Sequence, residues 1–176
     1  MMKTTLLALI AAFTVLSCQS LGQKAPSLLE QQEAKLFSDT SGVIDTQEGE
    51  KMISLYVAYV DSLPNDSIQC GEYLFKAAEV AMGIEEYWKS IQLFNRLQKQ
   101  YPGHDLVPDA LFYQGFVFEN NIGYIEYAKK CYTKYLLDYP RGERAQDVRS
   151  IMAVIDQPIE DVVKGWEENS NTEEKE

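Results

Sequence analysis

Three cysteines and one histidine are the side chains best suited to metal binding, thiol chemistry or proton transfer in this sequence. Cys70 and Cys131 lie 61 positions apart, which is no metal-binding spacing, and the single His104 cannot complete a ligand set. If the chain is exported, the two thiols could form a disulfide bond. Burial as two small apolar residues fits better, because the repeat described below places them in different columns. We therefore expect no metal.

The acidic and hydroxyl residues form no catalytic set. The adjacent pairs Glu85–Glu86 and Glu167–Glu168 point in different directions on a helix, so they cannot work as an acid and base pair. The sequence has no glycine-rich phosphate loop, no Gly-x-Ser-x-Gly and no paired Cys–His nucleophile. We therefore expect a protein that is not an enzyme and that needs no cofactor.

The third cysteine, Cys18, follows an apolar segment. Residues 1–17 carry one charge, Lys3, and then an apolar run over 6–16 that only Thr14 interrupts. The run is too short to span a bilayer, which takes about 20 residues. A basic residue followed by such a run is typical of a secretory signal peptide. A buried core helix is the alternative, but such a helix should have a polar face.

The tetrapeptide Val15-Leu16-Ser17-Cys18 resembles the lipobox of bacterial lipoproteins, whose cysteine is acylated after cleavage. The resemblance implies a signal peptide over 1–17 and lipidation of Cys18. It also implies a lipid-anchored protein of the bacterial cell envelope that faces the periplasm. Gln19 replaces the Asp that often marks retention in the inner membrane, which favours the outer membrane. Ordinary cleavage and secretion is the alternative.

The charge of the chain limits its partners. The 176 residues have a net charge of −11, and loss of residues 1–17 would remove Lys3 and no acidic residue, which gives −12. Such a chain is not expected to bind nucleic acid, because phosphate contacts need clustered Lys and Arg. Electrostatic attachment to anionic lipid is disfavoured for the same reason, so membrane contact would depend on the lipid anchor.

A period of 38 residues organises the rest of the sequence. Pro64, Pro102 and Pro140 are each 38 positions apart, and the windows 55–92, 93–130 and 131–168 align without gaps. The windows share an aromatic column (Tyr56, Phe94, Tyr132), a second large column (Tyr59, Leu97, Tyr135) and a small column (Ala77, Gly115, Ala153). Small residues let a neighbouring helix approach closely, and large residues fill the space around that contact.

The apolar residues within each window recur at helical spacing, as Tyr56, Tyr59 and Leu63 do. Each helix should end before its proline, because the residue before proline avoids the α region. Asp66 and Asp105 are candidates for N-caps or turn residues. The sequence therefore predicts an all-α fold of antiparallel helix pairs, with helices near 47–62, 68–82, 85–100, 106–120, 124–138, 143–155 and 158–168.

This pattern resembles the tetratricopeptide repeat. The matching positions are Ala77 or Ala78, Tyr87, Ser90, Phe94 and Pro102 in the first repeat, and Gly115, Phe118, Ala128, Tyr132 and Pro140 in the second. The second repeat has an extended inner loop at 119–123. The resemblance implies a repeat domain over 46–168, built as a short superhelix of stacked helix pairs. The repeat pattern of the chain is also similar to that of small envelope lipoproteins, of the lipoprotein of the outer-membrane β-barrel assembly machine and of the Tol–Pal-associated periplasmic coordinator.

The two ends of the repeat domain have their own patterns. At the C-terminal end, a stripe of Ile159, Val162, Val163 and Trp166 predicts an amphipathic capping helix at 158–168, followed by an acidic tail at 169–176. At the N-terminal end, residues 18–45 comprise the lipidated cysteine and a polar tether. The tether is expected to contain a short helix that docks on the repeats, built around Leu28, Leu29, Leu36 and Phe37.

The first helix of each pair lines the concave face in this repeat class, and partners dock there. The resemblance therefore implies a partner-binding face made of seven residues: Lys76, Glu79, Met82, Tyr113, Phe116, Glu119 and Asn120. For Tyr113 and Phe116, burial between helices is the alternative.

These features together predict a non-enzymatic protein-binding scaffold, anchored by lipid to the bacterial envelope. It would bind an envelope protein or an extended peptide, as an accessory to the assembly of envelope complexes. A lipoprotein that holds a small ligand or peptide in an aromatic groove is the alternative. End-to-end stacking of identical copies is disfavoured, because capped ends do not propagate. We expect a monomer or a member of a hetero-complex.

Overall fold

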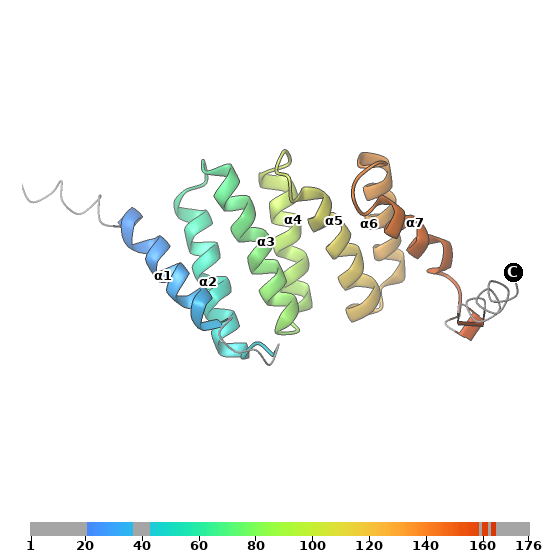
Figure 1. Cartoon of the computed structure of the whole chain (residues 1–176), viewed down its shortest axis with the longest axis horizontal. Helices are drawn as coiled ribbons and strands as arrows, with labels where there is room; N and C mark the ends of the chain where they lie inside the picture. The colour runs from blue at the N-terminus through green and yellow to red at the C-terminus, as the bar shows by residue number, and fades with distance from the viewer. Residues whose placement is uncertain (1–20, 37–42, 159, 162, 165–176) are drawn as a thin grey trace, which may run out of the picture. The chain divides into compact units, whose positions relative to one another are not determined.

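The computed structural model describes residues 21–36, 43–158, 160–161 and 163–164 (Figure 1). The regular structure in these ranges is helical throughout and contains no strand, which confirms the all-α prediction. The predicted signal peptide over 1–17, Cys18 and the predicted acidic tail at 169–176 lie outside the described residues.

The chain forms two compact units, residues 1–90 and 91–176. The first contains α1 (Leu21–Leu36), α2 (Thr46–Ser62), α3 (Ser67–Gly83) and the first turn of α4 (Tyr87–Gln100). The second contains the rest of α4, then α5 (Val107–Phe116), the π-helical segment η1 (Val117–Ile122), α6 (Ile125–Asp138) and α7 (Ala145–Val154). The bounds of α2 to α4, α6 and α7 lie within about two residues of the predicted ones, as is usual for helix ends.

An antiparallel pair, α2 and α3, forms the centre of the first unit (Figure 1). Each helix begins at an aspartate whose side chain accepts a hydrogen bond from a backbone N–H: Asp45 from Glu48 (3.0 Å) and Asp66 from Gln69 (3.2 Å). These bonds satisfy N–H groups that the first helical turn leaves without a partner. Asp66 is thus confirmed as an N-cap. The pair buries the side chains of Met52, Tyr56, Val60, Cys70, Leu74 and Ala77.

The second unit pairs α5 with α6, and α6 with α7. A Cβ atom added to Gly115 would lie 2.6 Å from Cε1 of Tyr132, so only glycine permits this approach of the two helices. The small column therefore faces a large aromatic residue, as predicted. Ala153, the third member of that column, is exposed on α7, so the prediction of a close helix contact is wrong there.

The 38-residue period is present in the backbone itself. The N–H groups of Leu63, Tyr101 and Tyr139 donate to the carbonyls of Tyr59, Leu97 and Tyr135. The N–H groups of Asp66, His104 and Gly142 then donate to the carbonyls of Leu63, Tyr101 and Tyr139, at 3.0 Å in each case. Each proline thus lies in the same turn. The aromatic column of Tyr56, Phe94 and Tyr132 is fully buried.

The structure corrects the inner loop expected at 119–123. Residues 117–122 form η1, and the chain leaves it at Gly123, whose φ of 76° lies in the left-handed region. The N–H of Tyr124 donates to the carbonyl of Phe118 at 2.7 Å, which closes the wide turn. A π turn inserts one extra residue into a helix. It lets Val117 and Phe118 stay buried while Asn120 and Asn121 face solvent.

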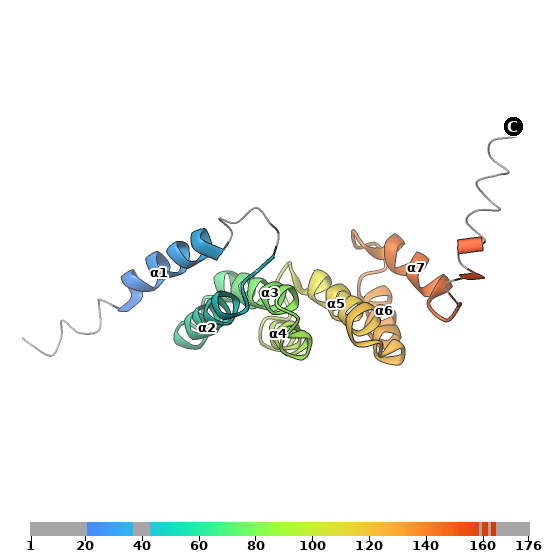
Figure 2. The same ribbon diagram turned by 90° about the horizontal axis from the view of Figure 1, so that it is seen from below.

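The short helix expected in the tether is present as α1, which packs against α2 (Figures 1 and 2). It is longer than expected, and it buries Leu29 and Leu36 but leaves Leu28 exposed. Phe37 lies outside the described residues, as do Ile159, Val162 and Trp166 of the predicted capping helix. Residues 160–161 and 163–164 of that helix are helical.

Candidate functional site

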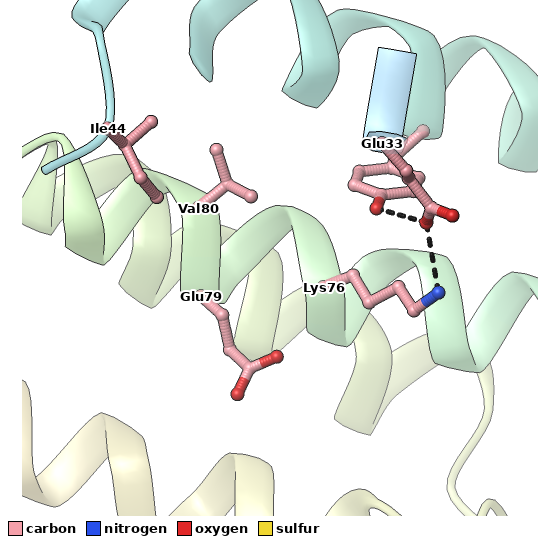
Figure 3. A pocket seen from close by; sticks show the side chains of 6 residues that line it. Glu33, Ile44, Lys76, Glu79 and Val80 are labelled. Carbon is pink, nitrogen blue, oxygen red and sulfur yellow. Dashed lines mark hydrogen bonds and ion pairs between the residues drawn. The ribbon is translucent and has the colours of Figure 1, made fainter. Parts of the chain in front are cut away.

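A cavity of about 440 Å³ opens in the first unit, between α1, α2 and α3 (Figure 3). Its lining consists of Glu33 from α1, Ile44 from the segment before α2, Tyr56 from α2, and Lys76, Glu79 and Val80 from α3. The cavity thus combines two carboxylates and one ammonium group with an apolar wall.

The polar side of the cavity is organised around Glu33. Its Oε1 atom lies 2.9 Å from Nζ of Lys76 and accepts a second hydrogen bond from the hydroxyl of Tyr56, as the dashed lines in Figure 3 show. Tyr56 can reach this atom because its ring is buried in α2 while its hydroxyl points toward α1. Hydrogen bonds to an ionised acceptor are the strong ones, so this three-residue contact fixes α1 on the pair.

These contacts set the ionisation of the groups involved. Partial burial raises the pKa of Glu33, but the hydrogen bonds from Tyr56 and Lys76 and the charge of Lys76 outweigh it and hold the pKa below its ordinary value. Burial, together with the nearby Glu33 carboxylate, raises the pKa of the Tyr56 hydroxyl. At neutral pH Glu33 is therefore a carboxylate that accepts, and Tyr56 is a protonated phenol that donates.

The apolar side of the cavity is formed by Ile44 and Val80. Ile44 fits against two glycines: a Cβ atom added to Gly49 would lie 3.2 Å from its Cγ2, and one added to Gly83 would lie 2.9 Å from its Cδ1. Val80 is buried in α3. Apolar walls with a few oriented polar groups are typical of sites that hold a ligand or a partner's side chain.

The structure brings together two of the residues predicted to bind a partner in the first repeat. Lys76 and Glu79 both line the cavity, whereas Met82 is half-buried at the end of α3 and does not line it. The sequence-based prediction missed Glu33, Ile44 and Tyr56 as site residues. The spacing of Leu29, Glu33 and Leu36 on one helical face was the signal that could have placed Glu33 there.

The other predicted residues lie in the second unit, where two of them take part in packing. The ring of Tyr113 stacks on Phe94 with centroids 6.1 Å apart, and the guanidinium of Arg144 lies 5.1 Å from its centre. Oε2 of Glu119 accepts a hydrogen bond of 2.6 Å from the buried Tyr132 hydroxyl.

Phe116 and Asn120, by contrast, present surface. The side chain of Phe116 is 36 % exposed and Asn120 is exposed. Nδ2 of Asn120 donates to the carbonyl of Phe116 at 3.2 Å, which ties the two residues together on one turn. They form the accessible part of the predicted face in this unit.

The thiols and the histidine serve the fold. Cys70 and Cys131 both remain thiols, and Sγ of Cys70 donates to the carbonyl of Leu63 at 3.1 Å. Burial raises the pKa of Cys131 to about 11, so its thiol is neutral at pH 7. Nδ1 of His104 accepts from the N–H of Leu106 in the turn before α5. Within the described residues, no group of His, Cys, Asp and Glu could hold a metal ion.

Among the described helices, none combines the length and the apolar character needed to cross a bilayer. No protein-family model matches the sequence, and a search of curated proteins finds no match.

Proposed function

We propose that the chain is a non-enzymatic protein-binding scaffold, anchored by lipid to the bacterial envelope, whose helix pairs stack into a short tetratricopeptide-type superhelix. The observation that carries this proposal is the 38-residue recurrence of the same turn and the same buried aromatic column. Repeats of this kind bury their core against neighbouring repeats and offer an extended surface to partners.

The proposed binding surface has its centre at the cavity on α3. Lys76 and Glu79 flank an opening with an apolar wall, into which a side chain of a partner protein could insert. In the second unit, Phe116 and Asn120 form a candidate contact surface of their own, with an aromatic and a polar side chain. The partner is an envelope protein or an extended peptide. The net charge of −11 makes nucleic acid an unsuitable one.

Photo-crosslinking in intact cells tests this function. A photoreactive residue would be placed at position 79 or position 116, and a matched control at Arg141, which is exposed in the turn after Pro140. We expect one defined protein to be captured from positions 79 and 116 and not from 141. Equal capture from all three positions, or no captured protein, would contradict a specific protein-binding face.

The anchor is tested by the intact mass of protein extracted from membranes, beside a Cys18→Ser variant. We expect a mature chain that begins at Cys18 and carries two or more acyl chains, which would make attachment stable. The variant should be unprocessed or released. An unmodified mature chain in the soluble fraction would contradict the lipid anchor and indicate a secreted protein. Because α1 begins at Leu21 and packs on α2, a lipid at Cys18 would hold the first unit close to the membrane.

The cavity also favours one alternative function, the binding of a small ligand. Its volume of about 440 Å³ falls in the range of known small-molecule sites, roughly 300–1,000 Å³. A thermal shift of the full chain with sugars or short peptides, lost in Glu79→Gln, would favour this alternative. Protein capture from position 79 without such a shift would favour the scaffold.

A further inference from the structure

The face of α2 and α3 that carries the cavity is already occupied by a helix of the same chain. Among residues 28–36 of α1, the buried side chains are Leu29, Gln32 and Leu36, with exposed fractions of 2 %, 6 % and 8 %. Their spacing of i, i+3 and i+7 places them on one stripe of the helix. A helix that lays one stripe into a groove is a common mode of protein recognition.

Polar contacts fix the register of α1 on this face. Besides the contacts of Glu33, Nε2 of Gln32 and Nζ of Lys35 each donate to Glu48 of α2 at 2.6 Å. The ion pair of Lys35 with Glu48 and that of Lys76 with Glu33 are partly exposed. Exposed ion pairs contribute little stability, so their main effect is to select one position of the helix.

The fit of α1 is incomplete. The cavity beside Glu33 remains between Ile44 and Val80, and no side chain described in α1 fills it. Two leucines and a set of partly exposed polar contacts therefore hold the helix. A helix with the same polar pattern and a larger apolar side chain at the cavity would bury more apolar surface there.

We propose that the α2–α3 face is a receptor for an amphipathic helix and that α1 occupies it in cis. The partner helix would carry two leucines seven residues apart and a carboxylate between them, which would replace Glu33 between Tyr56 and Lys76. This inference rests on the proposed protein-binding function and names the kind of partner. Binding in trans requires release of α1, so occupancy in cis lowers the apparent affinity of the face.

The test uses the full chain and a fluorescent synthetic peptide with the sequence of residues 21–36. Leu29→Glu would place a charge where the buried Leu29 packs against the α2–α3 face and would release α1. Leu28→Glu is the matched control, because Leu28 is 55 % exposed on the same helix. Fluorescence anisotropy should show at least tenfold tighter peptide binding to Leu29→Glu than to the parent chain or Leu28→Glu. Lys76→Glu added to Leu29→Glu should weaken peptide binding severalfold, because it replaces the ion pair with Glu33 by a repulsion.

Two outcomes would overturn the inference. One is the absence of peptide binding to Leu29→Glu while circular dichroism shows that the other helices remain folded. The other is equal binding of a scrambled peptide. If Leu29→Glu does not fold, Leu36→Glu serves the same purpose, because it places a charge at the other buried leucine of α1. If crosslinks from positions 79 and 116 persist alongside either outcome, the inference fails and the proposed function still stands.

Discussion

Lys76 and Glu33 lie 43 positions apart in the sequence and form an ion pair of 2.9 Å. Lys76 belongs to the face of α3 predicted to meet a partner, and Glu33 belongs to the segment predicted to be a tether. Their contact places the chain's own helix on the surface where a partner was expected. The same ion pair therefore belongs both to the packing of α1 in the fold and to the proposed binding surface.

Reversal of charge at either end of the pair should weaken the docking of α1. Lys76→Glu places two carboxylates together, and Glu33→Lys places two ammonium groups together. The doubly reversed chain should recover the interaction. Because the side chains are 45 % and 26 % exposed, we expect a coupling free energy of about 0.2–1 kcal/mol. Urea unfolding of the four proteins measures it as a double-mutant cycle, and additive effects of the two single changes would contradict it.

The docking of α1 should weaken in acid. Glu33 has a pKa below its ordinary value of 4.5, so its contacts contribute stability above about pH 4.5 and lose it as pH falls through the lowered pKa. The unfolding free energy of the parent chain should exceed that of Glu33→Gln at pH 7, and the difference should shrink below pH 4.5. Dilute protein is needed, because the isoelectric point is about 4.6. A difference that is constant from pH 7 to pH 3 would count against this role of Glu33.

The close approach of α5 and α6 depends on Gly115. In Gly115→Ala the new methyl group would overlap the ring of Tyr132, and we expect a loss of about 1–3 kcal/mol in unfolding free energy. Gly103→Ala is the matched control, because an added Cβ there meets no atom within 4 Å. Thermal unfolding of both variants checks the prediction. Equal stability of the two would show that Tyr132 moves aside freely.

One buried position of the repeat is a serine whose equivalents are apolar. Ser90 is fully buried, its Oγ has no hydrogen-bond partner among the described residues, and its equivalents one period away, Met52 and Ala128, are buried apolar residues. Ser90→Ala should therefore raise the unfolding free energy by about 1 kcal/mol, because an unpaired buried hydroxyl is unfavourable. Chemical denaturation measures the change. A decrease of similar size in the unfolding free energy would mean that the Ser90 hydroxyl has a hydrogen-bond partner.

Much of the fold could be predicted because the repeat is local. The prolines and the aromatic columns recur at a fixed spacing along the sequence. Within each helix, the buried residues lie three or four positions apart, which indicates the buried face. The segment η1 could not be predicted, because the apolar residues Val117 and Phe118 are compatible with an α-helix as well as with a π-helix. Only Gly123 marked the end of the segment in the sequence.

The site was predictable only in part. Lys76 and Glu79 were found through their place in the repeat, since equivalent positions of repeats share a face. Glu33 and Ile44 lie before the first repeat, have no equivalents in it and stand in a polar stretch that indicated a tether. Contacts between distant segments, such as that of Glu33 with Tyr56 and Lys76, leave no periodic trace in the sequence.

Amide hydrogen exchange of residues 28–36 in the full chain most directly tests whether α1 occupies the face of α2 and α3. We predict that these amides are protected in the parent chain at pH 7, less than those of α3, and that Leu29→Glu removes the protection while Leu28→Glu retains it. Exchange of residues 28–36 in the parent chain at the rate of an unfolded peptide would contradict the account, because the face would then be unoccupied.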